Sequence, residues 1–346
     1  MAFVMSAGTS KPVAVKRVDN AVPAEIRSRK VVGLGAAAID LLASVDTFPN
    51  PDDKIRTVSF EVAGGGNCAN TLTAVSRLGL PCSILTKIGD DGTGKQIISE
   101  LEGEGVDTSN VIVQQNMNSP FTYVLTERAG GTRTCIHTPS DSELHPWEVK
   151  SEWLEEADHL HLDGRHTLAA IEIAKLAIER GVPISLDVEK DRPHIRELLP
   201  LADFIITNQR YPKVFGEDVY SGMHSLLRLG RAKFVITTLG ADGSLFMCKR
   251  NAEDHDTADL DLKVMEFEDG EQAVLVRCPA EKVNQVVDST GAGDAFIGGI
   301  IYGLVSALPL WKMLKLSSRV ASVKLGQPGA RKGLPLRPSM DQELLI

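Results

Sequence analysis

The sequence predicts an α/β fold, a doubly wound and mostly parallel sheet flanked by helices, with a small β lid. From residue 158 onward, apolar runs such as "DHLHLDG", "PISLDVE" and "DFIITN" alternate with helical patterns such as "TLAAIEIAKLAIERG". Strands that alternate with helices form parallel βαβ units. Residues 47–62 and 110–138 interrupt this rhythm with alternating patterns, which indicate the lid. Ligands in such folds bind at the carboxyl ends of the strands.

The first half of the chain yields its elements in order. "KVVGLGAAAIDLLASV" is typical of a buried strand whose C-terminal end opens at Asp40. "GGGNCANTLTAVSRLGL" predicts a glycine-rich turn and then a helix that Gly79 closes. "CSILTKIG" predicts a strand, "GKQIISELEGEGV" a helix, and residues 111–137 a hairpin around a Gly-Gly turn.

Composition narrows the class of function. The chain has 346 residues, of which 43% are hydrophobic, and its net charge is -9. We expect no nucleic-acid partner, because no basic stripe stands out, and no membrane span, because no apolar stretch reaches roughly 18 residues. The five cysteines contain no C-x-x-C pair, which favours a reducing compartment over structural zinc.

The domain organisation is simple. Residues 1–30 are expected to be a mobile tail, and residues 31–346 a single domain without an internal linker. We expect a cytoplasmic protein; an organelle-targeting role for the tail is the alternative, weakened by its acids and scarce serines. The acidic segment 251–272 is expected to be a solvated loop leading into a strand.

Two glycine-rich stretches resemble nucleotide-binding motifs but lack residues that these motifs require. "GDDGTGKQ", residues 89–96, has the spacing of a phosphate-binding loop. Gln96 stands where a hydroxyl should meet magnesium, and Asp90 and Asp91 would repel phosphates, so a turn that starts a helix is preferred. "GLGAAA" at 33–38 ends in Ala38 and lacks a following ribose-binding acid, so a nicotinamide-dependent oxidoreductase is the weakest hypothesis.

Three histidines lie close together in the sequence. His159 and His161 alternate along a predicted strand and would share a face, and His166 follows. Metal binding is possible, but no neighbouring cysteine or carboxylate completes a site. Packing, or substrate contact at a strand end, is the preferred interpretation.

"VVDSTGAGDAFIGG", residues 286–299, carries the strongest signal for chemistry. Gly291, Ala292 and Gly293 can leave backbone N–H groups free to hold the charge that develops in phosphoryl transfer. Asp294 follows them and can accept the proton of an attacking hydroxyl. A plain helix N-terminus with an acidic first turn is the alternative explanation.

Two motifs together resemble the signatures of the ribokinase-like (PfkB) carbohydrate kinases. "GGGNCANTLTAVSRLG" is similar to the first signature and "DSTGAGDAF" to the second, about 220 residues apart, as in that family. The resemblance covers residues 31–340. Within the family, "GGNCAN", "GGTRTCIHTPS", "HLDGR" and "LDVEK" most resemble the ketohexokinase branch.

This resemblance implies transfer of the γ-phosphoryl group of ATP, as its Mg²⁺ complex, to a small sugar. Fructose is favoured, then ribose or another pentose. It also implies K⁺ as a cofactor and a homodimer that pairs through the lid. By motif, the resemblance assigns Asp294 as base and 291–293 as anion hole; Asp40, Gly65, Gly66, Asn67, Asn70 and Arg133 to the sugar; Thr238, Gly240, Gly243, Gly326 and Gly329 to ATP; and Asp288 and Thr290 to K⁺.

One departure from the family pattern affects the magnesium site. Many members carry N-x-x-E, whereas this chain reads Asn208, Gln209, Arg210, Tyr211. Asp187 and Glu189 are candidate substitutes. The missing glutamate also leaves open a catalytically weak or inactive relative that serves as a binding or regulatory protein.

Overall fold

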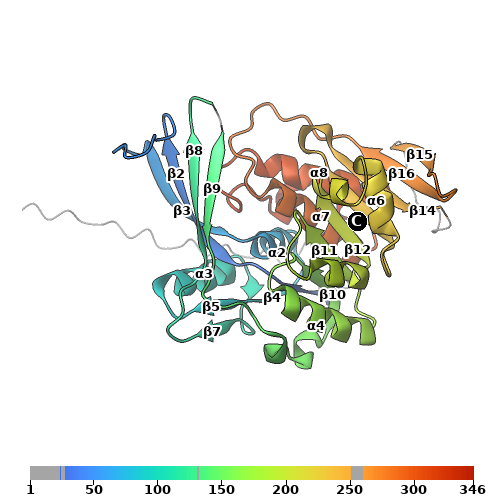
Figure 1. The fold of residues 1–346 in the computed structure, drawn as a ribbon, viewed down its shortest axis with the longest axis horizontal. Helices are drawn as coiled ribbons and strands as arrows, with labels where there is room; N and C mark the ends of the chain where they lie inside the picture. Colours follow the sequence, from blue (N-terminus) through green and yellow to red (C-terminus); the bar gives the residue numbers. More distant parts are fainter. Residues whose placement is uncertain (1–23, 25–27, 131, 251–259) are drawn as a thin grey trace, which may run out of the picture.

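A ten-stranded sheet with helices on both faces forms the body of the protein, and a four-stranded sheet projects from it (Figure 1). The computed structural model describes residues 24, 28–130, 132–250 and 260–346. Most of the predicted N-terminal tail, and residues 251–259 of the acidic segment, therefore lie outside the described residues. The helices of the described ranges are all too short or too polar to cross a membrane.

The large sheet is mostly parallel, as predicted. Strands from β13 to β6 run parallel, and β14, β16 and β15 form an antiparallel extension at one edge. Its strands are, in spatial order, β15 (Asp261–Glu266), β16 (Gln272–Cys278), β14 (Ser244–Lys249), β13 (Phe234–Thr238), β12 (Phe204–Asn208), β11 (Ile184–Val188), β10 (Ala157–Leu162), β1 (Lys30–Leu34), β4 (Cys82–Leu85) and β6 (Val106–Asp107).

Helices cover both faces of this sheet, so its central strands are buried on both sides. One apolar cluster packs α2 (Asn67–Arg77), α3 (Gly92–Gly103), α7 (Ala292–Val305) and α8 (Leu310–Lys324) on the sheet, and a second packs α4 (Thr167–Glu179), α5 (Ile195–Leu198) and α6 (Val219–Leu227) on the other face. Short 3₁₀ helices are η2 (Pro146–Glu148), η3 (Ser151–Leu154), η4 (Leu199–Leu201), η5 (Tyr211–Val214), η6 (Gly240–Asp242), η7 (Arg337–Ser339) and η8 (Gln342–Leu344).

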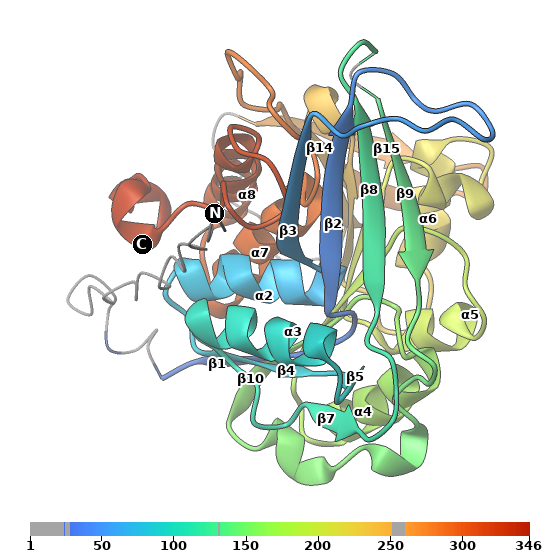
Figure 2. The ribbon, with the colours of Figure 1, turned by 90° about the vertical axis from the view of Figure 1, so that its left-hand side faces the viewer.

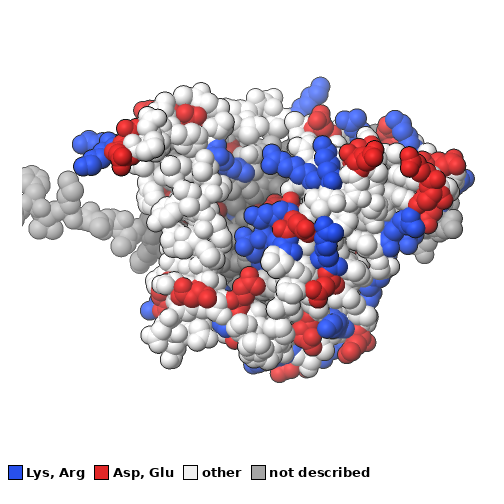
Figure 3. Space-filling view, viewed as in Figure 1, with Lys and Arg blue, Asp and Glu red and all other residues white. Residues whose placement is uncertain are grey.

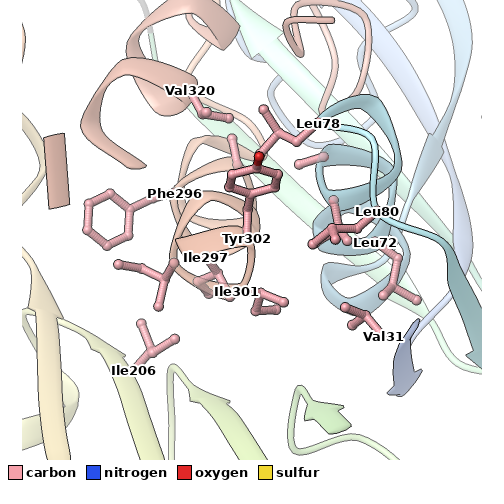
Figure 4. Packing of buried hydrophobic residues seen from close by; sticks show 14 of the residues in the cluster. Val31, Leu72, Leu78, Leu80, Ile206, Phe296, Ile297, Ile301, Tyr302 and Val320 are labelled. Carbon is pink, nitrogen blue, oxygen red and sulfur yellow. The ribbon is translucent and has the colours of Figure 1, made fainter. Parts of the chain in front are cut away.

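Helix α7 is apolar almost all round because it is packed between its neighbours and the sheet (Figure 4). Phe296, Ile297 and Ile301 are buried there, each worth roughly 1.5–3 kcal/mol of stability. Gly298 and Gly299 allow the close approach, since a side chain at either position would overlap α2 or α8. This packing fixes the N-terminus of α7, where the "GAGD" motif lies.

The small sheet consists of β3 (Ser59–Gly65), β2 (Ala38–Val45), β8 (Phe121–Glu127) and β9 (Arg133–Thr138) and stands beside the body (Figure 2). It begins earlier in the chain than the alternating pattern indicated. The apolar run through Asp40 forms two strands, because the chain bends at the small residues 35–37, and Asp40 lies inside β2 rather than at a strand end. Residues 112–114 form β7, which pairs with β5 (Lys87–Gly89) instead.

Candidate active site

Asp294 lies in the first turn of α7 and is only 7% exposed. The turn before it depends on Gly291, which has a positive φ of 75° and packs so closely on Ala330 that a side chain would overlap it. Burial, together with the nearby charges of Glu189, Asp163 and Asp40, raises the pKa of Asp294 to about 7, although the hydrogen bond from Asn70 opposes the shift. A carboxyl group with such a pKa can accept a proton near neutral pH.

A chain of hydrogen bonds orients this carboxylate. Asn70 Nδ2 donates to Asp294 Oδ2 at 2.8 Å. Arg331 Nε donates to Asn70 Oδ1 at 2.9 Å, and its Nη2 donates to the carbonyl oxygen of Gly65 at 2.7 Å. Because the guanidinium can only donate, it fixes which end of the amide faces Asp294. The sequence motifs pointed to Asn70 but not to Arg331, which lies 261 residues away from it.

Asp40 presents a second buried carboxylate near Asp294. Desolvation raises its pKa to about 6, although the nearby Arg331 charge opposes the shift. Gly65 permits this placement, because a side chain there would overlap the Asp40 carboxylate. Gly66 follows at the start of α2 with a positive φ of 91°. Asp40, Gly65, Asn70 and Asp294, which the resemblance assigns to sugar and base, therefore come together.

Asn67 takes a different partner. Its Nδ2 donates to Asp187 Oδ2 at 3.3 Å. Burial and the neighbouring carboxylates of Glu189 and Asp294 raise the pKa of Asp187 well above its usual value. Asp163 also lies in this acidic region, but it accepts hydrogen bonds from the Ala36 and Cys68 amides and so joins the end of β10 to the bend after β1 and to the start of α2.

The first turn of α7 limits which amides can bind an anion. The Ala292 N–H donates to the carbonyl oxygen of Ser289 at 3.2 Å. Of the three amides that the resemblance assigns to an anion hole, those of Gly291 and Gly293 have no hydrogen-bond acceptor among the described residues. The leading N–H groups of a helix lack intrahelical partners and attract negative charge.

The loop before α7 is held by several donors. Asp288 Oδ1 accepts from both the amide and the hydroxyl of Thr290, at 2.8 and 2.7 Å. Its Oδ2 accepts from the Gly329 amide at 2.8 Å, and its carbonyl oxygen accepts from Lys324 Nζ at 2.7 Å. Burial alone would raise the pKa of Asp288, but these hydrogen bonds and the Lys324 charge hold it below its usual value.

Arg133 connects the small sheet to this loop. It is the first residue of β9, and its Nη1 lies 2.8 Å from Thr290 Oγ1, 3.1 Å from Ser289 Oγ and 3.5 Å from Asp288 Oδ1. The side chain therefore spans from the small sheet to the loop in front of α7. Its contacts in the structure are with that loop, whereas the family resemblance assigns Arg133 to the sugar.

Asp187 and Glu189 fit a divalent cation by their chemistry. Asp187 lies near the carboxyl end of β11 and Glu189 directly after that strand, and carboxylate oxygens are the ligands that Mg²⁺ prefers. Burial is the main cause of the raised pKa of Asp187, and the part that the Glu189 charge adds is the kind that a bound cation relieves. In the N-x-x-E region, Asn208 Nδ2 donates to the Glu189 carbonyl at 3.0 Å, whereas Tyr211 is buried and its hydroxyl has no partner among the described residues.

The residues that the resemblance assigns to ATP lie in two parts of the fold, the segment after β13 and the turn after α8. Thr238 and Gly240 lie at the end of β13 and in η6, and Gly243 makes a turn so close to the Cys278 carbonyl that no side chain fits. Gly326 is exposed in the turn after α8. Gly329 instead uses its amide to bind Asp288. Gly240, like Gly326, is exposed, and Gly329 supports the loop before α7.

A set of basic residues faces the small sheet and was not singled out by the sequence analysis. Arg165, Arg192 and Lys190 lie close enough to His137 that, together with burial, they lower its pKa. His137 belongs to β9, and its Nδ1 is 3.2 Å from Thr122 Oγ1. Figure 3 shows a hollow beside the small sheet with Lys and Arg side chains at its margin. Such a margin suits a polyphosphate.

The rejected phosphate-loop and dinucleotide motifs have structural roles. Asp91 caps α3, where its Oδ1 accepts from the Gly94 amide at 2.7 Å, so residues 89–96 form the preferred turn before a helix. "GLGAAA" leads from β1 into β2 and not into a helix. It therefore lacks the helix N-terminus that binds a pyrophosphate.

Two of the three histidines, His159 and His161, are packed inside the protein. His159 and His161 both contact Ser185 Oγ, at 2.8 and 3.0 Å, and burial lowers the pKa of each to about 3. Among the described residues, the one group with metal-ligand geometry is His224, Asp269 and Glu271, far from these histidines in the sequence.

Comparison with known proteins agrees with this arrangement. Residues 28–337 match the pfkB family carbohydrate kinase. An ATP-dependent ribose-1-phosphate kinase of Halopiger xanaduensis is 26% identical over 305 residues, covering 87% of this chain and 94% of that protein, and a ketohexokinase of Mus musculus is 22% identical over 321 residues, covering 88% and 98%. The ribokinase of Arabidopsis thaliana, solved with ribose and ATP, superposes with a TM-score of 0.74 at 24% identity and covers 92% of this chain and 98% of its own, which shows the ribokinase fold. The chain therefore belongs to the PfkB family of carbohydrate kinases.

Proposed function

We propose that this protein transfers the γ-phosphoryl group of ATP to a hydroxyl of a small sugar, with fructose as first candidate and ribose as second. One observation carries the proposal. Asp294 is a buried carboxylate with a pKa raised to about 7, placed directly behind the two free amides of Gly291 and Gly293. A base and an anion-binding turn at adjacent positions are what phosphoryl transfer to an alcohol requires.

In the proposed reaction Asp294 accepts the proton of the attacking sugar hydroxyl. The amide of Asn70 holds Oδ2, so that the second carboxylate oxygen is left for the hydroxyl. Gly291 and Gly293 face the charge that develops on the transferred phosphoryl group. Mg²⁺ held by Asp187 and Glu189 would neutralise phosphate charge in the bound nucleotide.

Sugar recognition is assigned to the inner face of the small sheet. Asp40, Thr122 and His137 lie side by side across β2, β8 and β9. Carboxylate, hydroxyl and imidazole groups can bind vicinal hydroxyls in pairs. Fructose leads because of the ketohexokinase-like motifs, and ribose follows because related sequences include ribokinases. The contact of Arg133 with the 288–290 loop would close the sheet over the sugar and exclude water.

The outer face of the same sheet supports a homodimer. Val62, Leu41, Tyr123 and Ile136 lie opposite one another across all four strands, and Phe60 shares their face. Tyr123 is 44%, Ile136 54% and Phe60 60% exposed. Tyr123, Ile136 and Phe60 are thus exposed on the face opposite to that of Asp40, Thr122 and His137. We assign this face to a second copy of the chain, whose sheet would cover it.

The proposed activity is tested by ADP release with Mg²⁺-ATP over fructose, ribose, xylulose, other sugars and nucleosides. The expected result is turnover that depends on a sugar and yields a phosphomonoester, visible by ³¹P NMR. The Asp261→Asn variant controls for loss of a carboxylate, since Asp261 is exposed and pairs with Lys263 at the sheet edge. ATP binding without turnover on any acceptor would favour the non-catalytic alternative.

A further inference from the structure

The loop before α7 has the residues that the family resemblance assigns to K⁺, and their contacts argue against K⁺. A cation site needs oxygen atoms that point unobstructed at one position. Asp288 and Thr290 offer such oxygens in the sequence. In the structure, the oxygens of Asp288 that the site would use are engaged by donors of the protein itself.

Each oxygen of Asp288 can be followed to its donor. Oδ1 accepts from the amide and hydroxyl of Thr290, and Oδ2 accepts from the Gly329 amide. The carbonyl oxygen accepts from Lys324 Nζ at 2.7 Å. Thr290 Oγ1, which donates to Asp288, also accepts from Arg133 Nη1 at 2.8 Å. Each of these oxygens is therefore already engaged by at least one N–H or O–H donor of the protein.

Two basic side chains border this position. Lys324 Nζ is bonded to the Asp288 carbonyl, and Arg133 lies 3.5 Å from Asp288 Oδ1. A K⁺ ion bound to the same residues would be repelled by both at short range, in a partly buried region where screening is weak. Lys324 and Arg133 therefore already supply positive charge to the loop before α7.

Lys324 is held rigidly where it can supply that charge. It is the last residue of α8 and is fully buried. The Val287 amide donates to the Leu325 carbonyl at 2.8 Å, and Gly333 packs directly on the Lys324 backbone. The end of α8, the 287–290 loop and the turn that begins α7 thus form one connected unit.

We propose that the Lys324 ammonium acts as a built-in monovalent cation, so that this kinase does not require K⁺. An ammonium group and K⁺ have the same charge and similar size, and a lysine tethers that charge to the chain at pH values below its pKa, which burial lowers to about 8. Lys324 is then a positioning residue: it holds the Asp288 carbonyl and, through the loop, the amides of Gly291 and Gly293. This inference rests on the proposed function for its effect on rate, but not for its effect on cation binding.

The first test needs no substrate. Thermal unfolding of the wild-type protein is compared in KCl and in tetramethylammonium chloride at equal ionic strength. A bound ion stabilises a fold by RT ln(1 + c/Kd), where c is its free concentration and Kd its dissociation constant. We expect equal unfolding temperatures in the two salts. A rise specific to K⁺ in the wild-type protein would show that the site binds the ion and would overturn the proposal.

The second test uses the acceptor that gives turnover. Wild-type rates should be the same in KCl and tetramethylammonium chloride, and stimulation by K⁺ would contradict the proposal. In tetramethylammonium, Lys324→Met should lose activity by about tenfold or more, as when one donor at an anion hole is removed. Lys175→Met is the control, because Lys175 lies on α4 with its side chain 57% exposed.

A third variant separates charge from packing. Lys324→Ala removes the ammonium and leaves space, so NH₄Cl or KCl should restore part of its activity and raise its unfolding temperature, whereas tetramethylammonium should do neither. If neither NH₄⁺ nor K⁺ restores activity or stability, the positive charge of Lys324 is not what the variant has lost, and the proposal is refuted. If no acceptor supports turnover, the unfolding measurements still decide whether K⁺ binds.

Discussion

Asn70 donates a 2.8 Å hydrogen bond from Nδ2 to Asp294 Oδ2, across 224 residues of sequence. The bond joins the N-terminal parts of α2 and α7, whose packing brings the two signature motifs together. It occupies one carboxylate oxygen and lowers a pKa that burial would otherwise raise further. Asn70 therefore tunes the base as well as aiming it.

Arg331 should matter because it fixes the orientation of Asn70. Arg331→Met is expected to lower kcat by about tenfold, since a misaimed base loses part of the 10²–10⁴-fold that general bases contribute. Loss of the nearby positive charge should also raise the Asp294 pKa, so the acidic limb of the kcat/KM profile should move to higher pH. Lys332→Met is the matched control, since Lys332 is exposed and pairs with Glu61. An unchanged profile in Arg331→Met would contradict this role.

The rate of the wild-type enzyme should depend on pH through Asp294. The base must be ionised to accept a proton, and the pKa of the buried group is raised to about 7. We expect kcat/KM to fall as pH drops below about 7, in a titration of one proton. A profile that stays flat down to pH 5 would exclude Asp294 as the titrating base.

The raised pKa of Asp294 should also affect how protein stability depends on pH, which can be measured without any substrate. The folded-state pKa of Asp294, about 7, lies above the ordinary value of 3.8, so its contribution to stability is fully present below pH 4 and lost as pH rises through 7. The Asp294→Asn variant has no such loss. Its unfolding temperature relative to wild type should therefore increase from pH 5 to pH 8. A difference that does not change with pH would mean that the Asp294 pKa is not raised.

The outer face of the small sheet should control oligomeric state. Phe60→Asp combined with Ile136→Asp places two charges on the apolar face and should convert a dimer to a monomer in sedimentation velocity. Tyr220→Asp is the control, because Tyr220 is also a large exposed side chain, 40% exposed, but lies on α6. A wild-type protein that sediments as a monomer at high concentration would refute the dimer.

Much of this arrangement was predictable because it depends on local patterns. The alternation of strands and helices gave the parallel sheet, and the small residues of "GAGD" gave the α7 N-terminus. The bend at residues 35–37 was missed, since an apolar run does not show where one buried strand ends and the next begins. Asp40 was consequently placed at a strand end instead of inside β2.

Long-range partners were beyond the reach of the sequence. Arg331 and Lys324 look like ordinary basic residues near the end of the chain, and only tertiary packing buries them against Asn70 and Asp288. Arg331 and Lys324 are distinguished by being charged residues that are buried next to a signature motif. The periodicity of the sequence does not show such burial. The same holds for Arg192, whose closeness to Arg165 and the small sheet depends on the fold.

The central claim, that Asp294 is the base of a sugar kinase, is tested most directly by comparing Asp294→Asn with wild type on the acceptor that gives turnover. The account predicts a fall in kcat of at least about 10²-fold, with sugar affinity by calorimetry nearly unchanged, because the neutral amide keeps the size of the side chain but cannot accept the proton. A variant that retains wild-type kcat would contradict the account.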